Sequence, residues 1–247
     1  MTISENNETV VEYSSRHKSI LRDYPIPDID EDSHFSELFG ICRPYTMTAK
    51  DAMYALYKSV EYICKRKIAG AFVECGVWKG GSALLAGLAA RSFGDVSREI
   101  YLYDTFEGMT APTEQDIDVN GDKAQDLIDT HGDSGKWCYA HRPEVERLFA
   151  SFDLADSSHF IEGDVLDTIS HTKPKEISLL RLDTDWYEST KFELDNLYDL
   201  IQPGGIVIID DYGHWQGSRR AVDEFFSRAP FIMLHRVNYA VRLGIKI

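Results

Sequence analysis

From residue 71 onwards the chain alternates short hydrophobic runs with amphipathic stretches, and this alternation constrains the fold more than any other feature. The runs that predict strands are AFVECG (71–76), EIYLYDTF (99–106), HFIEGD (159–164), ISLLRLD (177–183) and GGIVIIDD (204–211). The stretches with helical periodicity between them are 82–93, 144–152, 188–201 and 217–229. Strands that alternate with helices in this way form a parallel sheet that is covered on both faces.

The chain finishes with two β-rich runs, 231–237 and 240–247, which predict an antiparallel hairpin that turns at Asn238-Tyr239. A parallel sheet that ends in such a hairpin is typical of the class I methyltransferase fold, a Rossmann-like, doubly wound α/β sheet of seven strands. A helical stripe at 48–67 precedes the first strand, and the chain before it is polar. We therefore expect an N-terminal arm at 1–47 and a class I methyltransferase domain at 48–247.

A long stretch rich in Asp, Gly and Thr separates the second strand from the next helix, at 107–141. Loops of this length inside a compact domain are usually functional lids or disordered segments. We expect an acidic lid insertion at 107–141 that, together with the N-terminal arm, roofs the active site.

The charge balance excludes several classes of partner. A net charge of -15 disfavours a nucleic-acid backbone and an anionic membrane, both of which attract clustered Lys and Arg. The first residues lack the apolar core of a signal peptide, and no apolar run approaches the ~20 residues of a membrane span. Four widely spaced cysteines without a CxxC pair favour reduced thiols. We expect a cytoplasmic protein with a small-molecule substrate.

The first strand leads into a glycine turn, VECGVWKGGSA (73–83). Glycines at this place let a ligand approach the backbone, and the helix that follows offers unpaired N–H groups. The spacing matches neither GxGxxG nor the P-loop pattern. An acid on the strand, Glu74, followed by Gly76 and Ser82, suits S-adenosylmethionine, because its ammonium and sulfonium groups are cationic.

The next two strands also end in acids. Asp104 lies where a carboxylate can hold a ribose diol, and Asp164 lies near the expected position of an adenine edge. Either acid alone could be a solvated turn residue or a helix cap. Acids at the ends of consecutive strands beside a glycine turn indicate a nucleoside-type cofactor.

A group of carboxylates follows the fourth and fifth strands, which are neighbours in this fold. Asp183 ends one strand, and Asp210 and Asp211 end the other. Without a cation these groups would repel one another, whereas Mg²⁺ or another hard divalent ion would bind them. Such an ion would lower the pKa of a substrate hydroxyl, so that a carboxylate could take its proton. We expect Asp185 to cap the next helix, outside the metal set, and His214 to be a second base, a substrate contact or a structural residue.

Four stretches closely resemble the macrocin and mycinamicin O-methyltransferase family, which includes the novobiocin deoxysugar methyltransferase. They are VECGVWKGGSA, LYDTFEGMTAPT, LLRLDTDWYEST and PGGIVIIDDYGHWQGSRRAVDEFF, and the resemblance runs from about Arg43 to the C-terminus. It implies S-adenosylmethionine- and Mg²⁺-dependent methylation of a deoxysugar hydroxyl on an antibiotic or similar metabolite. It also implies a homo-oligomer in which N-terminal elements help to build the substrate pocket.

Site residues carried over by motif agree with those chosen from the strand ends. Asp183, Asp210 and Asp211 would be the metal ligands, with Asp183 also the general base. The residues at cofactor positions would be Glu74, Gly76, Ser82, Asp104 and Asp164. The segment RPYTMT (43–48) matches one that approaches cofactor and sugar, which suggests Thr46 as a cofactor contact and Tyr45 as a substrate contact. Aromatic residues that could form a wall against a sugar, or simply pack in the core, are Trp186, Tyr187 and Trp215, beside His214.

Two other functions remain open on this sequence. Catechol O-methyltransferases share the fold and the metal arrangement, but they have a lysine base three residues after the first metal Asp, where this chain has Trp186. A non-catalytic cofactor-binding protein is the second alternative. Intact carboxylates at all three metal positions speak against it.

Overall fold

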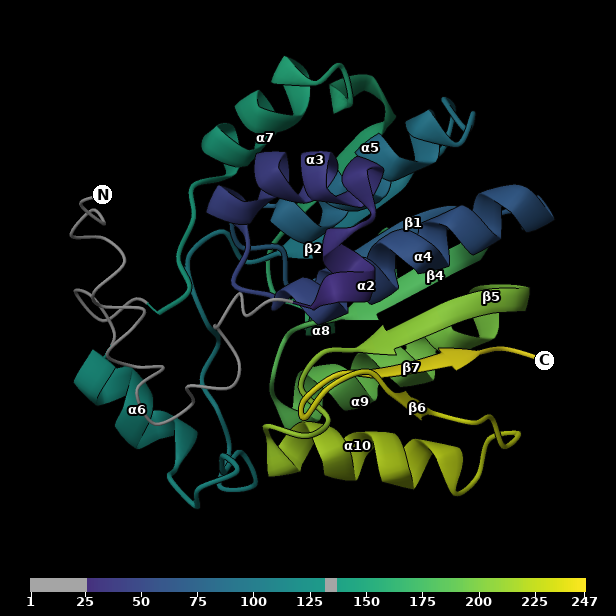
Figure 1. The fold of residues 1–247 in the computed structure, drawn as a ribbon. Coiled ribbons are helices and arrows are strands. Elements are labelled where there is room, and N and C mark those ends of the chain that lie inside the picture. The colour runs from purple at the N-terminus through teal and green to yellow at the C-terminus, as the bar shows by residue number, and fades with distance from the viewer. Residues whose placement is uncertain (1–25, 132–136) are drawn as a thin grey trace.

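The computed structural model describes residues 26–131 and 137–247 and contains a seven-stranded sheet in the order β3-β2-β1-β4-β5-β7-β6 (Figure 1). The strands are β1 (Ala71–Cys75), β2 (Ile100–Asp104), β3 (Ser158–Glu162), β4 (Ile177–Leu182), β5 (Ile201–Ile209), β6 (His235–Arg236) and β7 (Arg242–Ile245). β1 to β5 pair in parallel, whereas β7 runs antiparallel to both β5 and β6. The expected Rossmann-like class I methyltransferase sheet with its C-terminal hairpin is therefore confirmed.

Helices cover both faces of the sheet, because successive side chains of each strand point to opposite sides. On β5, Ile206 and Ile208 belong to one hydrophobic cluster, and Val207 and Ile209 belong to the other. The first cluster packs under α3, α4, α5 and α7, and the second packs under α8, α9 and α10 (Figure 1). The helices are α2 (Pro27–Asp30), α3 (Ser33–Cys42), α4 (Lys50–Arg66), α5 (Gly81–Ser92), α6 (Ala124–His131), α7 (Arg142–Ser151), α8 (Val165–His171), α9 (Tyr187–Leu197) and α10 (Gln216–Phe226).

The junction before β5 differs from the sequence expectation. The helix expected at 188–201 ends at Leu197, a 3-10 turn occupies Tyr198–Leu200, and β5 already begins at Ile201. Between β4 and β5, Ile177 pairs with Ile201 but Leu179 already pairs with Ile206, so the register is irregular between these two pairs. Pro203, which has no N–H to donate, lies in this irregular stretch.

Part of the expected N-terminal arm packs into the main domain. α3 buries Phe35 and Cys42 in the same hydrophobic cluster as Met53 of α4 and Leu84 of α5. Residues 1–25 of the expected arm and 132–136 of the expected lid lie outside the described residues. In the part of the chain that is described, no helix combines the length and the apolar character that a bilayer crossing requires.

Two buried acids, Asp116 and Asp118, hold the segment predicted to be a lid against the helices that follow β4 and β5. Asp116 accepts hydrogen bonds from the backbone N–H of Thr113 and of Tyr187, the latter at 2.8 Å. Asp118 forms a β-bridge with Trp215, just ahead of α10. An N–H at a helix start needs an acceptor from outside the helix, and here the lid supplies it. Figure 1 shows this segment reaching from the β2 side of the sheet to α10.

Candidate active site

The glycine turn after β1 lies against the end of β4. Gly76 has a φ of 82°, and a Cβ at this position would come within 2.0 Å of the Asp183 carbonyl oxygen. The backbone N–H of Asp183 in turn donates to Cys75 at 2.8 Å. Only glycine fits this approach, so the turn predicted to bind a cofactor and the first carboxylate of the acidic group are adjacent.

The segment before α4 crosses the first turn of α5. A Cβ on Gly81 would lie 2.6 Å from the backbone of Tyr45, and the buried Thr46 Oγ1 lies 3.4 Å from Ser82 Oγ. Thr46 and Ser82, two of the predicted cofactor residues, therefore meet beside the glycine turn. The contact of Tyr45 here is made by its backbone.

Asp104 organises the loops after β1 and β2. Its Oδ2 accepts from the N–H groups of Val77 and Trp78 at 2.7 and 2.9 Å, and its Oδ1 accepts from Phe106 at 2.7 Å. Burial raises the pKa of this carboxyl, and the three N–H groups oppose that effect. Asp164 caps α8 by accepting from Leu166 N–H at 2.9 Å, which is the helix-cap alternative for that residue. Ribose and adenine contacts by these two acids stay predictions.

A polar hollow of about 460 Å³ opens beside the ends of β2 and β3. Its rim carries Arg142, which pairs with Glu146 and Glu162. The residues that line it are Phe106, Glu107, Tyr139, His141, Arg142, Pro143, Glu146 and Glu162. Ligands of open α/β sheets bind outside the carboxyl ends of the strands, which is where this hollow lies.

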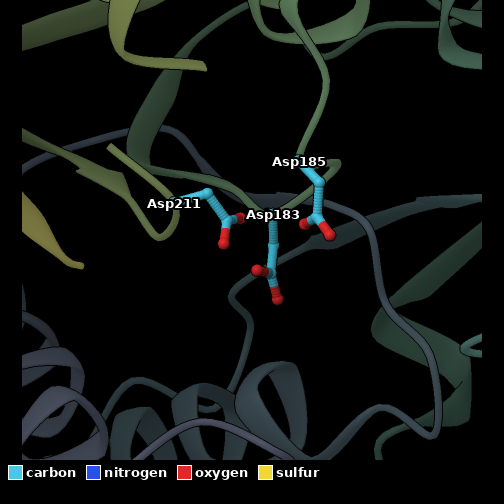
Figure 2. Close-up of side chains that lie close together, drawn as sticks. All are labelled: Asp183, Asp185 and Asp211. Atoms are coloured by element: carbon cyan, nitrogen blue, oxygen red, sulfur yellow. The ribbon is translucent and has the colours of Figure 1, made fainter. Parts of the chain in front are cut away.

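Three carboxylates converge where β4 and β5 end. One oxygen from each of Asp183, Asp185 and Asp211 lies within 4.8 Å of the other two, and Figure 2 shows the three side chains side by side. Burial, with repulsion from Asp183 and Asp210, raises the pKa of Asp185 to about 7. Burial raises the pKa of Asp183 and of Asp211 well above their ordinary values.

This donor set fits a hard divalent ion. Mg²⁺ prefers oxygen ligands and retains some water, so a few carboxylate oxygens in one place suffice. Asp211 Oδ2 is buried and has no hydrogen-bond partner among the described residues. A cation would satisfy this oxygen and remove the repulsion that otherwise favours the protonated carboxyls.

The structure corrects the expectation that Asp185 is a helix cap. The residue that precedes α9 is Trp186, which makes no side-chain cap, and the first N–H of the helix is bound by Asp116 from the lid. Asp185 adopts a left-handed conformation with a φ of 69°, and its carboxylate joins Asp183 and Asp211 instead.

Asp210 lies differently from the other predicted metal ligands. Its Oδ1 accepts from Arg181 Nη2 at 2.7 Å, and Asp210 is not part of the group of three that the described residues form. The predicted ligand set and the observed group share Asp183 and Asp211.

The sequence reading missed Arg181, a buried residue of β4 with only 3% of its surface exposed. Its guanidinium pairs with Glu74 at 2.5 Å, Asp183 at 2.6 Å and Asp210 at 2.7 Å. Burial raises the pKa of Glu74 to about 7, against the opposing pull of Arg181. An arginine within the hydrophobic run ISLLRL is the signal that could have found it, because buried charges are rare unless paired.

The predicted aromatic wall is packed beneath the lid. Trp186 and Trp215 are each 2% exposed, with ring centroids 5.0 Å apart, and Trp186 Nε1 donates to the carbonyl of Thr110. Tyr187 donates to Glu224 at 2.8 Å, and His214 Nδ1 lies 3.2 Å from the Tyr239 hydroxyl. The packing alternative therefore describes both tryptophans in this structure, and contact with a sugar stays a prediction for this group.

The sheet order, the glycine turn and the acids at the strand ends together define a class I methyltransferase, the fold of S-adenosylmethionine-dependent enzymes. The chain belongs to the macrocin O-methyltransferase (TylF) family, whose model matches residues 28–232. The resemblance drawn from the sequence is therefore confirmed.

Named relatives support this assignment. A tetracenomycin-C rhamnosyl 4'-O-methyltransferase of Streptomyces olivaceus is 31% identical over 74% of this chain and 68% of its own length. The demethyldecarbamoylnovobiocin O-methyltransferase of Streptomyces niveus is 31% identical over 76% of this chain and 69% of its own. The solved O-methyltransferase NovP is 28% identical, with a TM-score of 0.72 and 82% of each chain covered.

Proposed function

We propose that this chain transfers a methyl group from S-adenosylmethionine to a sugar hydroxyl of a secondary metabolite, with the help of a divalent cation. The observation that carries the proposal is the convergence of Asp183, Asp185 and Asp211 directly beside the glycine turn at Gly76. Two relatives favour a sugar as the acceptor: the tetracenomycin-C rhamnosyl 4'-O-methyltransferase, and the mycinamicin III 3''-O-methyltransferase of Micromonospora griseorubida, which is 27% identical over 74% of this chain and 71% of its own length.

The cofactor would lie across the carboxyl ends of β1, β2 and β3. Gly76, Ser82 and Thr46 would surround its methionine end, because they meet at the first turn of α5. Asp104 and Asp164 would lie toward the nucleoside, next to the polar hollow at the ends of β2 and β3. In this arrangement the methyl group would lie on the side of the carboxylates.

The metal would be held by Asp183 and Asp211, completed by Asp210 or Asp185. When bound, a divalent cation supplies positive charge that lowers the pKa of an alcohol. Asp183 would take the hydroxyl proton, with His214 as the second candidate base. The substrate oxygen would then form a bond to the methyl carbon as the carbon–sulfur bond breaks, and the electrons of that bond would pass to the sulfur.

Exclusion of water and placement of the substrate would depend on the lid. Asp116 and Asp118 connect the proposed lid to α9 and α10, and Trp186 and Trp215 pack against its side chains. Tyr45, Tyr187 and the two tryptophans remain proposed substrate contacts. Placement of the substrate by these residues would favour in-line attack through positioning.

Asp183→Asn tests the assignment of base and metal ligand. We expect it to abolish methyl transfer while leaving S-adenosylmethionine affinity, measured by calorimetry, nearly unchanged. The exposed Asp199→Asn serves as the matched control and should behave like the wild type. Near-normal turnover of Asp183→Asn would sink the assignment.

The acceptor class needs a panel of nucleotide-linked sugars, glycosylated natural products and catechols, with and without EDTA. Transfer to a sugar hydroxyl that EDTA stops and Mg²⁺ restores is the expected result. Transfer to catechols alone would favour the phenolic alternative, and cofactor binding without any turnover would favour a non-catalytic protein. The resemblance further suggests a homo-oligomer, which sedimentation would test. The cysteine pattern suggests a cytoplasmic protein, which cell fractionation would test.

A further inference from the structure

We infer that Arg181 is a positioning residue that orients two carboxylates of the site and joins the segment at 43–48 to them. A guanidinium carries only N–H donors, so it can neither accept a hydrogen bond nor bind a cation, and we infer that it acts through the residues to which it donates. The part of this role that concerns the cation rests on the proposed function, because Asp183 and Asp210 are proposed metal ligands. The contact between Arg181 and the segment at 43–48 does not depend on the proposed methyl transfer.

The contacts of Arg181 come from four separate elements. Nη1 donates to Glu74 of β1 and to Asp183, which follows β4. Nη2 donates to Asp210, which follows β5, and to Thr48 Oγ1 at 2.9 Å, just ahead of α4. Four donors of one planar group are therefore engaged at fixed angles.

These contacts select one oxygen of each acid. Arg181 donates to Asp183 Oδ2 and to Asp210 Oδ1, and among the described residues it makes no hydrogen bond to the second oxygen of either carboxylate. A lysine would keep the charge, but its compact ammonium cannot reproduce the planar fork. Charge and orientation can therefore be separated by a single substitution.

Through Thr48, Arg181 also contacts the segment at 43–48, which crosses α5. This segment already contacts the first turn of α5 through the backbone of Tyr45 over Gly81 and through Thr46 against Ser82. The hydrogen bond from Arg181 to Thr48 adds a contact with the carboxylate side. One guanidinium thus contributes both to the seating of residues 43–48 and to the orientation of Asp183.

Arg181→Lys is the decisive variant, and Mn²⁺ affinity measured by calorimetry is the first readout. Loss of a partner that orients a metal ligand commonly weakens metal binding roughly 10- to 100-fold, and we expect a decrease in that range. We also expect faster hydrogen exchange at 43–48, and a larger fall in kcat than rise in KM for S-adenosylmethionine. Circular dichroism would verify that the variant is folded.

Arg98→Lys is the matched control. Arg98 is also largely buried and also contacts β4, through Ser178 Oγ, but it lies at the amino ends of the strands and pairs with Asp95. We expect this variant to lose stability without a change in Mn²⁺ affinity. Equal weakening of Mn²⁺ binding by both lysine variants, or wild-type affinity in Arg181→Lys, would overturn the inference.

Thr48→Val tests the link to the segment on its own and remains informative if Arg181→Lys does not fold. We expect faster exchange at 43–48, and unchanged exchange there would overturn the link. A wild-type protein that binds Mn²⁺ and methylates no acceptor would refute the proposed function but leave the role of Arg181 standing. A wild-type protein that binds no Mn²⁺ would overturn both the proposed metal site and the inference that Arg181 orients its ligands.

Discussion

Glu193 is a buried acid whose ionisation should make stability depend on pH. It lies on α9 with none of its surface exposed, and its Oε1 accepts from Thr184 Oγ1 at 2.9 Å. Thr184 stands between Asp183 and Asp185 in the loop after β4. Burial raises the pKa of Glu193 from 4.5 to about 8. At neutral pH the folded protein therefore keeps this carboxyl protonated, whereas the unfolded chain ionises it.

The sign follows from the proton balance. Because the pKa is higher in the folded state, the unfolded chain releases its proton first, and the free energy of unfolding falls as pH rises from about 4.5 to about 8. The full loss across that window is about 5 kcal/mol, since a tenfold change in proton affinity is worth about 1.4 kcal/mol. Between pH 5.5 and pH 8.5 the same relation gives a loss of roughly 3 kcal/mol.

Glu193→Gln removes this dependence while keeping the size of the side chain and an acceptor for Thr184. In urea unfolding at the two pH values, we expect the variant to gain roughly 3 kcal/mol relative to the wild type at the higher pH. Glu188→Gln, on the exposed side of the same helix, is the control and should show the same difference from the wild type at both. If the free energy of unfolding of Glu193→Gln also differed from that of the wild type by the same amount at both pH values, the reasoning would be refuted.

Two further predictions concern the glycine turn and the lid. Gly76→Ala should unfold the protein or lower its melting temperature far more than Gly94→Ala, because both glycines have positive φ but only Gly76 has a neighbour, the Asp183 carbonyl at 2.0 Å from the added Cβ. Equal melting temperatures for the two variants would contradict the close approach. Asp116→Ala should speed proteolysis within 107–131 several-fold, because it removes the acceptor of the Thr113 and Tyr187 N–H groups. The Tyr187 N–H would then be buried and unsatisfied, at a cost of about 1–3 kcal/mol. Wild-type cleavage rates would show that other contacts hold the lid.

The sequence by itself determined the sheet and the family. Hydrophobic runs of strand length, spaced by amphipathic stretches, leave few topologies for a chain of this kind, and the C-terminal hairpin selects among them. The sequence also placed Asp104, Asp164 and Asp183 at strand ends, because those acids directly follow hydrophobic runs. These inferences succeed because they depend on local periodicity, which is written along the chain.

The tertiary structure alone decided which acids face one another. Asp183 and Asp185 are two residues apart, and the left-handed φ of Asp185 determines that it joins the cluster and does not cap α9. Arg181 and Glu74 are 107 positions apart, and the cap of α9 comes from Asp116, 71 positions before Tyr187. Side-chain direction at a loop depends on one backbone angle and on distant partners, and neither leaves a periodic signal in the sequence.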